Sequence, residues 1–129
     1  METVLFQAHS GVRYAVLLAG VIALAILLLG RFRGRPFGRN ASLSGAIFAG
    51  LLDLQVLLGL ATVAVRPWYP ALIGHIALMV VAAVTSHAVR ARLRRAKEDA
   101  RRYALAQLAL VLPLLLILAG ITAIGRRVI

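Results

Sequence analysis

Four long stretches almost free of charged residues constrain this chain more than any other feature. Arg13 to Arg31, Arg39 to Arg66, Arg66 to Arg90 and Arg102 to Arg126 enclose 17, 26, 23 and 23 residues, and Asp53 is the one charged side chain among them. A helix that crosses the hydrocarbon of a bilayer needs about 20 apolar residues, with a range of about 17–25. The spacing therefore predicts four membrane-spanning helices, at about 8–30, 42–65, 70–90 and 103–125.

The composition favours one membrane domain and excludes a soluble or disordered chain. Hydrophobic residues make up 62% of the sequence and charged residues 15%, whereas soluble domains have about 45–50% and about 25%. A length of 129 residues allows one domain, so we expect residues 1–129 to form a single all-α, up-down-up-down four-helix bundle. The chain has no cysteine, which excludes disulfides, thiolate metal sites and covalently attached haem.

The positions of the basic residues predict how the bundle is oriented. Eleven of the 15 Lys and Arg residues lie at 31–39 and 90–102, the connections that follow the first and third spans. Basic loops of membrane proteins stay in the cytoplasm, so both termini are expected outside. These loops can also attract anionic lipid. They lack the base-reading and stacking side chains of a nucleic-acid site, so no nucleic-acid partner is expected.

Polar side chains inside the spans carry most of the functional information. Such residues are costly in hydrocarbon and usually face the bundle interior or a cavity. They are His9, Arg13, Asp53, Gln55, His75, His87 and Gln107.

His9 and His75 form the natural pair for a shared ligand. His75 and His87 are twelve residues apart on one helix, about 18 Å along its axis, so they cannot bind the same metal ion. His9 and His75 belong to different helices in the outer half of the bundle, and Arg13 lies one turn from His9 on the same face. Imidazoles can occupy the axial positions of haem iron, and a guanidinium matches a propionate carboxylate. The alternative is that both histidines contact water, headgroups or backbone carbonyls.

The remaining polar residues allow several interpretations. Asp53 can make a structural contact between helices, a salt bridge to Arg13, or a proton relay with Gln55 and a histidine; we rank the Arg13 pair first. His87 can turn toward the interface or serve a second haem or a quinone headgroup. Gln107 is its nearest candidate neighbour on the fourth span.

Three short motifs resemble a known family. They are the opening His9-Ser10-Gly11-Val12-Arg13-Tyr14, the run Asp53-Leu54-Gln55, and the pair His75 and His87. This pattern resembles small bacterial four-helix membrane proteins often labelled cytochrome b-like, which share a His-Ser-x-x-Arg-aromatic opening in which Trp is frequent where Tyr14 stands here. The resemblance implies haem b, electron transfer and a bacterial inner membrane. Because the chain has three histidines, it cannot supply four ligands for two haems.

Other function classes remain open at this stage. The chain can be a non-enzymatic accessory or assembly subunit of a larger membrane complex, or a small transporter in which Asp53 and histidines line a pathway. No zinc-protease motif, phosphate-binding glycine loop or nucleophile elbow occurs, so no catalytic residue is predicted and enzymatic activity stays open. A quinone, a periplasmic redox protein and further copies of the chain are the partners to consider.

Overall fold

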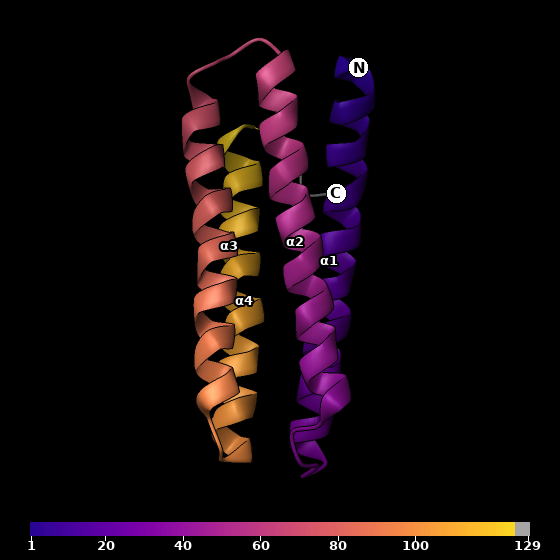
Figure 1. Ribbon diagram of the computed structural model, residues 1–129, viewed down its shortest axis with the longest axis vertical. Coiled ribbons are helices and arrows are strands. Elements are labelled where there is room, and N and C mark those ends of the chain that lie inside the picture. Colours follow the sequence, from indigo (N-terminus) through magenta and orange to yellow (C-terminus); the bar gives the residue numbers. More distant parts are fainter. Residues whose placement is uncertain (126–129) are drawn as a thin grey trace.

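The chain folds into four antiparallel helices, and the computed structural model describes residues 1–125. The helices are α1 (Glu2–Phe32), α2 (Arg39–Val65), α3 (Ala71–Arg95) and α4 (Asp99–Ala123), and no strand occurs in the described part. They run up and down side by side (Figure 1), which confirms the predicted all-α four-helix bundle. All four are long and apolar enough to cross a membrane, which indicates a multi-pass protein in a lipid bilayer.

The helices are longer than the predicted spans. α1 begins at Glu2 rather than near residue 8, α3 continues to Arg95, and α4 begins at Asp99 rather than near residue 103. The charge-free stretches mark only the part of each helix that can meet hydrocarbon. Strong helix formers such as Arg and Ala extend the same helices beyond it.

Backbone chemistry sets two of the helix ends. α2 stops where Arg66 precedes Pro67 and takes extended angles, φ −115° and ψ 157°, because the proline ring disfavours a helical residue before it. The chain leaves α1 through Gly34, whose φ of +65° is favourable for glycine and costly for residues with a Cβ.

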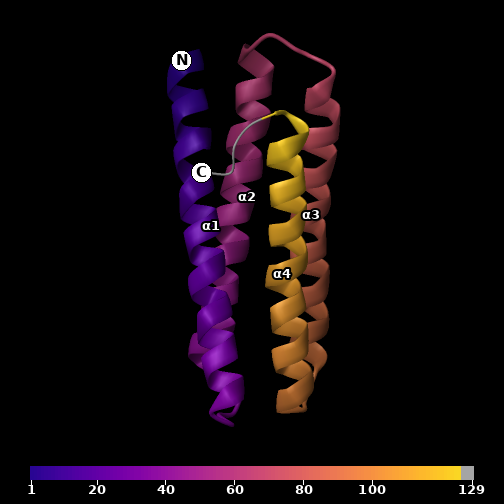
Figure 2. The same ribbon diagram turned by 180° about the vertical axis from the view of Figure 1, so that it is seen from behind.

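The bundle consists of two hairpins. α1 packs closely along α2 and α3 along α4, whereas packing between the hairpins is sparser, and α1 and α3 lie diagonally without direct backbone proximity. Figures 1 and 2 show the two pairs side by side. We call the end with connections 33–38 and 96–98 the basic end. The opposite end, with connection 66–70, is the proline end.

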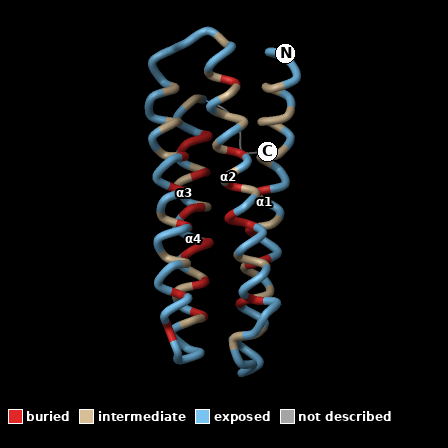
Figure 3. Tube along the Cα trace, in the orientation of Figure 1, coloured by how far each residue is buried: buried red, intermediate tan, exposed pale blue. Residues whose placement is uncertain are grey.

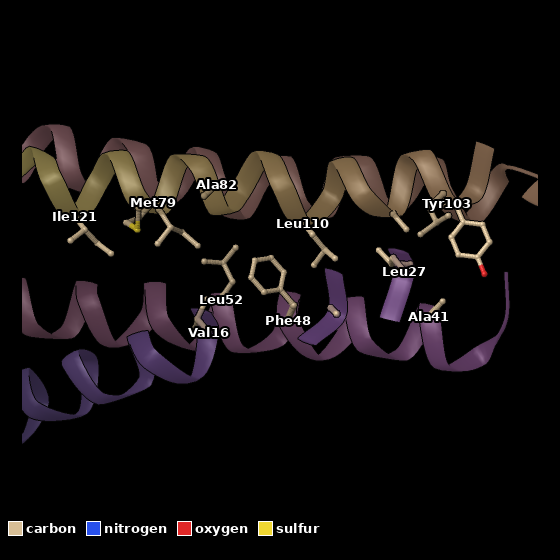
Figure 4. Packing of buried hydrophobic residues seen from close by; sticks show 14 residues of the cluster. Val16, Leu27, Ala41, Phe48, Leu52, Met79, Ala82, Tyr103, Leu110 and Ile121 are labelled. Atoms are coloured by element: carbon tan, nitrogen blue, oxygen red, sulfur yellow. The ribbon is translucent and has the colours of Figure 1, made fainter. Parts of the chain in front are cut away.

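Buried side chains lie between the hairpins, and apolar side chains also cover the outside. The buried residues face the middle of the bundle in Figure 3, and Phe48 and Leu52 of α2 project toward α4 and its Leu110 in Figure 4. Leu57 and Leu115 are 64% and 58% exposed on the outer faces. An apolar exterior around an apolar core suits a bundle surrounded by lipid rather than water.

The first connection is fastened to the start of α4 at the basic end. The Tyr103 hydroxyl donates a hydrogen bond to the Arg35 carbonyl (3.0 Å), and its ring packs edge-on against Phe37 (5.3 Å between ring centres). The backbone N–H of Phe37 donates to the Asp99 carboxylate (3.2 Å). These contacts join the two hairpins at this end.

The approach of α1 to the rest of the bundle gives a stability prediction. A Cβ at Gly20 would lie 2.9 Å from Leu114 Cδ2 and 3.1 Å from Phe48 Cε2, whereas a Cβ at Gly11, on the same helix, would meet nothing within 4 Å. Gly20→Val should therefore destabilise the protein by about 1–3 kcal/mol through overpacking.

Thermal unfolding in detergent measures this effect, with Gly11→Val as the matched control for valine in a helix. Equal unfolding temperatures for the two variants would contradict the packing described here.

Candidate functional site

A cavity of about 150 Å³ lies between the hairpins toward the proline end, and all four helices contribute to its wall. The lining includes His9, Arg13, Gln55 and His75, four of the polar residues predicted from the sequence. Asp53, His87 and Gln107 do not line it. The structure therefore divides the predicted residues into a group at the cavity and a group elsewhere.

His9 is oriented by Gln55 of α2. Its Nδ1 lies 3.2 Å from the backbone oxygen of Gln55, and its Nε2 lies 3.5 Å from the side-chain nitrogen of the same residue. A carbonyl oxygen accepts only and an amide nitrogen donates only. Both contacts therefore assign the proton to Nδ1 and the lone pair to Nε2.

His75 is oriented in the same way within the other hairpin. Its Nδ1 lies 2.8 Å from the backbone oxygen of Gly120, so Nδ1 donates and Nε2 carries the lone pair of the neutral ring. A backbone carbonyl on the second ring nitrogen is how proteins commonly fix the tautomer of a metal-binding histidine.

The two imidazoles meet across the diagonal of the bundle. Their ring centres are 6.4 Å apart and their planes cross at 86°. The expected proximity of His9 and His75 is confirmed, while their role as ligands stays a prediction.

Gly59 makes room for the His9 ring, because a Cβ there would lie 2.9 Å from His9 Cε1. Gly120 makes room for Met79, whose Cε would lie 2.5 Å from a Cβ at Gly120, whereas His75 Nδ1 would be in ordinary contact at 3.5 Å. The sequence alone did not assign Gly59 to the site. A glycine that faces a histidine of the neighbouring helix would have been the signal, but only once the helices were paired.

Two arginines line the cavity, although the sequence singled out one. Arg13 Nη2 donates to the hydroxyl of Tyr14 (3.0 Å), and its buried Nε has no hydrogen-bond partner within residues 1–125. The guanidinium of Arg66 lies 4.1 Å from the ring centre of Phe6, with its Nε 3.6 Å from a Glu2 carboxylate oxygen. In the sequence analysis, Arg66 only marked the boundary between the second and third spans.

The expected pairing of Asp53 with Arg13 is wrong. Both carboxylate oxygens of Asp53 contact His87 Nε2, at 2.9 and 2.8 Å. Asp53 and Gln55 are two residues apart, about 200° around a helix with 3.6 residues per turn. Gln55 faces the cavity, so Asp53 points away from it toward α3. This also separates Asp53 from Gln55 as members of one proton relay.

The sequence suggested that Gln107 lies beside His87, but in the structure the two residues are not neighbours. The side-chain oxygen of Gln107 accepts a hydrogen bond from Arg31 Nη1 of α1 (2.8 Å). α4 lies beside α1 at the basic end, so this bond adds a further connection between the hairpins. His87 instead contacts Asp53 of α2.

Comparison of the chain with known protein families, with curated proteins and with solved structures finds no match. The chemistry of the site must therefore be inferred from its own residues. Within the described residues, no three or more His, Cys, Asp or Glu side chains are grouped so that they could hold a metal ion. The cavity thus offers two imidazoles and two guanidinium groups, with no carboxylate ligand set.

The hydrogen bonds of the three histidines predict their tautomers. His9 and His75 should carry the proton on Nδ1, whereas His87 should share a proton with Asp53 through Nε2. Nitrogen-15 NMR of histidine-labelled protein distinguishes the two nitrogens, and the variants His9→Ala, His75→Ala and His87→Ala assign the signals. A neutral His9 or His75 protonated on Nε2 would contradict the geometry.

Proposed function

We propose that the chain is a membrane-embedded electron-transfer protein, similar to b-type cytochromes, that binds one haem b through His9 and His75. The observation that carries the proposal is the pair of imidazoles that meet across the bundle, each with Nδ1 on a backbone carbonyl. In both rings the lone pair is then on Nε2, the nitrogen farther from the helix backbone.

The proximity of the two rings supports their holding one group together. Their centres are 6.4 Å apart, and both side chains lie in the wall of the same cavity. Each ring could bind iron through Nε2, because Nδ1 lies against a backbone carbonyl in both.

The small number of protein ligands favours haem over a bare metal ion. Zinc and calcium sites draw three or more ligands from the protein, and no such group occurs among residues 1–125. A haem would bring most ligands of its iron with it, so His9 and His75 would be sufficient to hold it.

The two arginines of the cavity suit the propionates of haem. A guanidinium binds a carboxylate through two parallel N–H donors, and Arg13 has a buried Nε without a partner in the described structure. Arg13 and Arg66 lie on the same cavity as the two histidines. We assign them to the propionates.

The volume of the cavity sets one requirement. Pockets for ordinary small ligands are about 300–1,000 Å³, and this cavity is about 150 Å³. The ligand set suits haem, but the hairpins must stand farther apart in the loaded protein.

When bound, the haem would supply one-electron redox chemistry. The chain's own residues would hold its orientation and exclude water, since Val16, Met79 and Ile117 line the same cavity. We further propose a bacterial inner-membrane location with both termini outside, supported by the basic connections. The redox partner would then be a membrane quinone or a periplasmic electron carrier.

The three histidines allow a direct test of ligation. Protein expressed with sufficient haem should show a Soret band and reducible α-bands, and His9→Ala or His75→Ala should abolish the low-spin spectrum because one of the two proposed ligands to the iron would be lost. His87→Ala is the matched control and should leave the spectrum intact, since His87 is not at the cavity. A wild-type protein without a Soret band, or equal loss in all three variants, would refute the proposal.

The reduction potential tests the assignment of Arg13. Removing a positive charge near the iron disfavours the reduced form, so Arg13→Gln should lower the midpoint potential by an amount on the order of tens of millivolts. Arg33→Gln, at the basic end, should leave it unchanged. Redox titration of the two variants measures the difference, and an unaltered potential in Arg13→Gln would remove this arginine from the site.

A further inference from the structure

The Asp53–His87 pair lies on the outer face formed by α2 and α3, away from the cavity. The two side chains are in close contact, at 2.8 Å, and yet 44% and 51% exposed, respectively. Asp53 is also close to the midpoint of α2 (Arg39–Val65). A polar pair is therefore turned outward at the depth of the hydrocarbon.

The pair retains hydrogen-bonding capacity toward the outside. A net charge is costly in hydrocarbon, so we expect the pair to be neutral, either as carboxylate and imidazolium or as carboxylic acid and imidazole, with the proton between them on His87 Nε2 or on Asp53. In both forms His87 Nδ1 carries a proton that Asp53 does not receive, and the Asp53 oxygens keep further lone pairs. Hydrocarbon offers neither donors nor acceptors, so a second polar surface is needed at this position.

The surrounding residues form a continuous stripe on each helix. On α2, Ala46, Gly50, Asp53 and Leu57 follow helical spacing, and on α3, Val84, His87 and Ala91 do the same. All but Asp53, which is partly exposed, are exposed, and a Cβ at Gly50 would meet nothing within 4 Å. Small side chains at Ala46 and Gly50 would let another helix approach closely.

We propose that this face binds a second copy of the chain, forming a dimer with a two-fold axis along the membrane normal. One copy offers an outward donor, His87 Nδ1–H, beside an outward acceptor, Asp53. A two-fold axis places the donor of each copy on the acceptor of the other, which makes the surface complementary to itself.

The depth of Asp53 and His87 in the membrane supports a second copy of the chain as the partner. Asp53 and His87 touch within one chain, so they lie at the same depth in the membrane. A second copy inserted with the same orientation presents its own pair at that depth, and both intermolecular hydrogen bonds form at once. The donor and acceptor on this face of one copy therefore lie at the same depth as the acceptor and donor of a second copy.

The absence of cysteine makes disulfide cross-linking a clean test. Gly50→Cys should give a disulfide-linked dimer in membranes, because its position one turn from Asp53 lies within the proposed interface and a disulfide requires Cα atoms about 4.4–6.8 Å apart. Val21→Cys and Leu115→Cys are the controls. These residues are 62% and 58% exposed on α1 and α4 and should remain at least fivefold less cross-linked.

A mixed pair of variants tests the role of Asp53 and His87. In a Gly50→Cys background, Asp53→His gives a chain with two imidazoles, and His87→Asp gives one with two carboxylates. Each breaks its own internal pair and repels its own copy. Co-expressed with different tags, they should form mixed dimers several-fold in excess of the statistical proportion, because only the mixed dimer pairs opposite partners.

The outcomes are distinct and do not depend on haem. A Gly50→Cys dimer together with excess mixed dimers supports the proposal. A Gly50→Cys chain that stays monomeric, cross-links equally strong at Val21 or Leu115, statistical mixing, or a cross-linked product containing a different protein would each overturn it. The Gly50→Cys result stands alone if either charge variant fails to insert.

Discussion

Hydrocarbon supplies no hydrogen bonds, and this constraint explains how Thr62, His9 and His75 are partnered in the bundle. Thr62 returns its hydroxyl to the Leu58 carbonyl of its own helix (2.8 Å), while His9 and His75 use carbonyls of the neighbouring helix in their hairpin. These bonds fix the rings before any ligand is considered, since their partners belong to the backbone. The same constraint makes the outward Asp53–His87 pair informative, because lipid cannot complete its hydrogen bonds.

The number and type of the helices could be predicted because they depend on a property that can be counted along the sequence. Uninterrupted apolar length determines where a chain can cross a membrane, so the spacing of arginines was sufficient. The proximity of His9 and His75 followed in the same way from depth along the helix axis. Helix bounds were less accurate, since residues such as Arg94 and Arg95 remain helical in water beyond the hydrocarbon.

The wrong predictions concern the direction in which a side chain points around its helix axis. Asp53 and Gln55 lie at nearly the same depth, yet they face opposite sides of α2, and depth alone could not assign Arg13 to one or the other. The pairing of α1 with α4 at the basic end likewise decided that Gln107 meets Arg31. Gly59 and Arg66 gained meaning only when the helices were placed, because a glycine or an arginine in a sequence does not reveal which ring it faces. The resemblance to cytochrome b-like proteins implies haem b, and we propose that His9 and His75 bind it.

The two hairpins are joined in a different way at each end of the bundle. At the basic end, Tyr103, Asp99 and Gln107 join them through side-chain hydrogen bonds. At the proline end, the short connection 66–70 joins α2 to α3 covalently. From Gln107 to Gly120 is roughly 20 Å along α4. Over that distance, a difference of about 5° in the angle between the hairpins changes their separation by nearly 2 Å. The width of the site near Gly120 and His75 is therefore sensitive to the angle at which the basic end holds the hairpins.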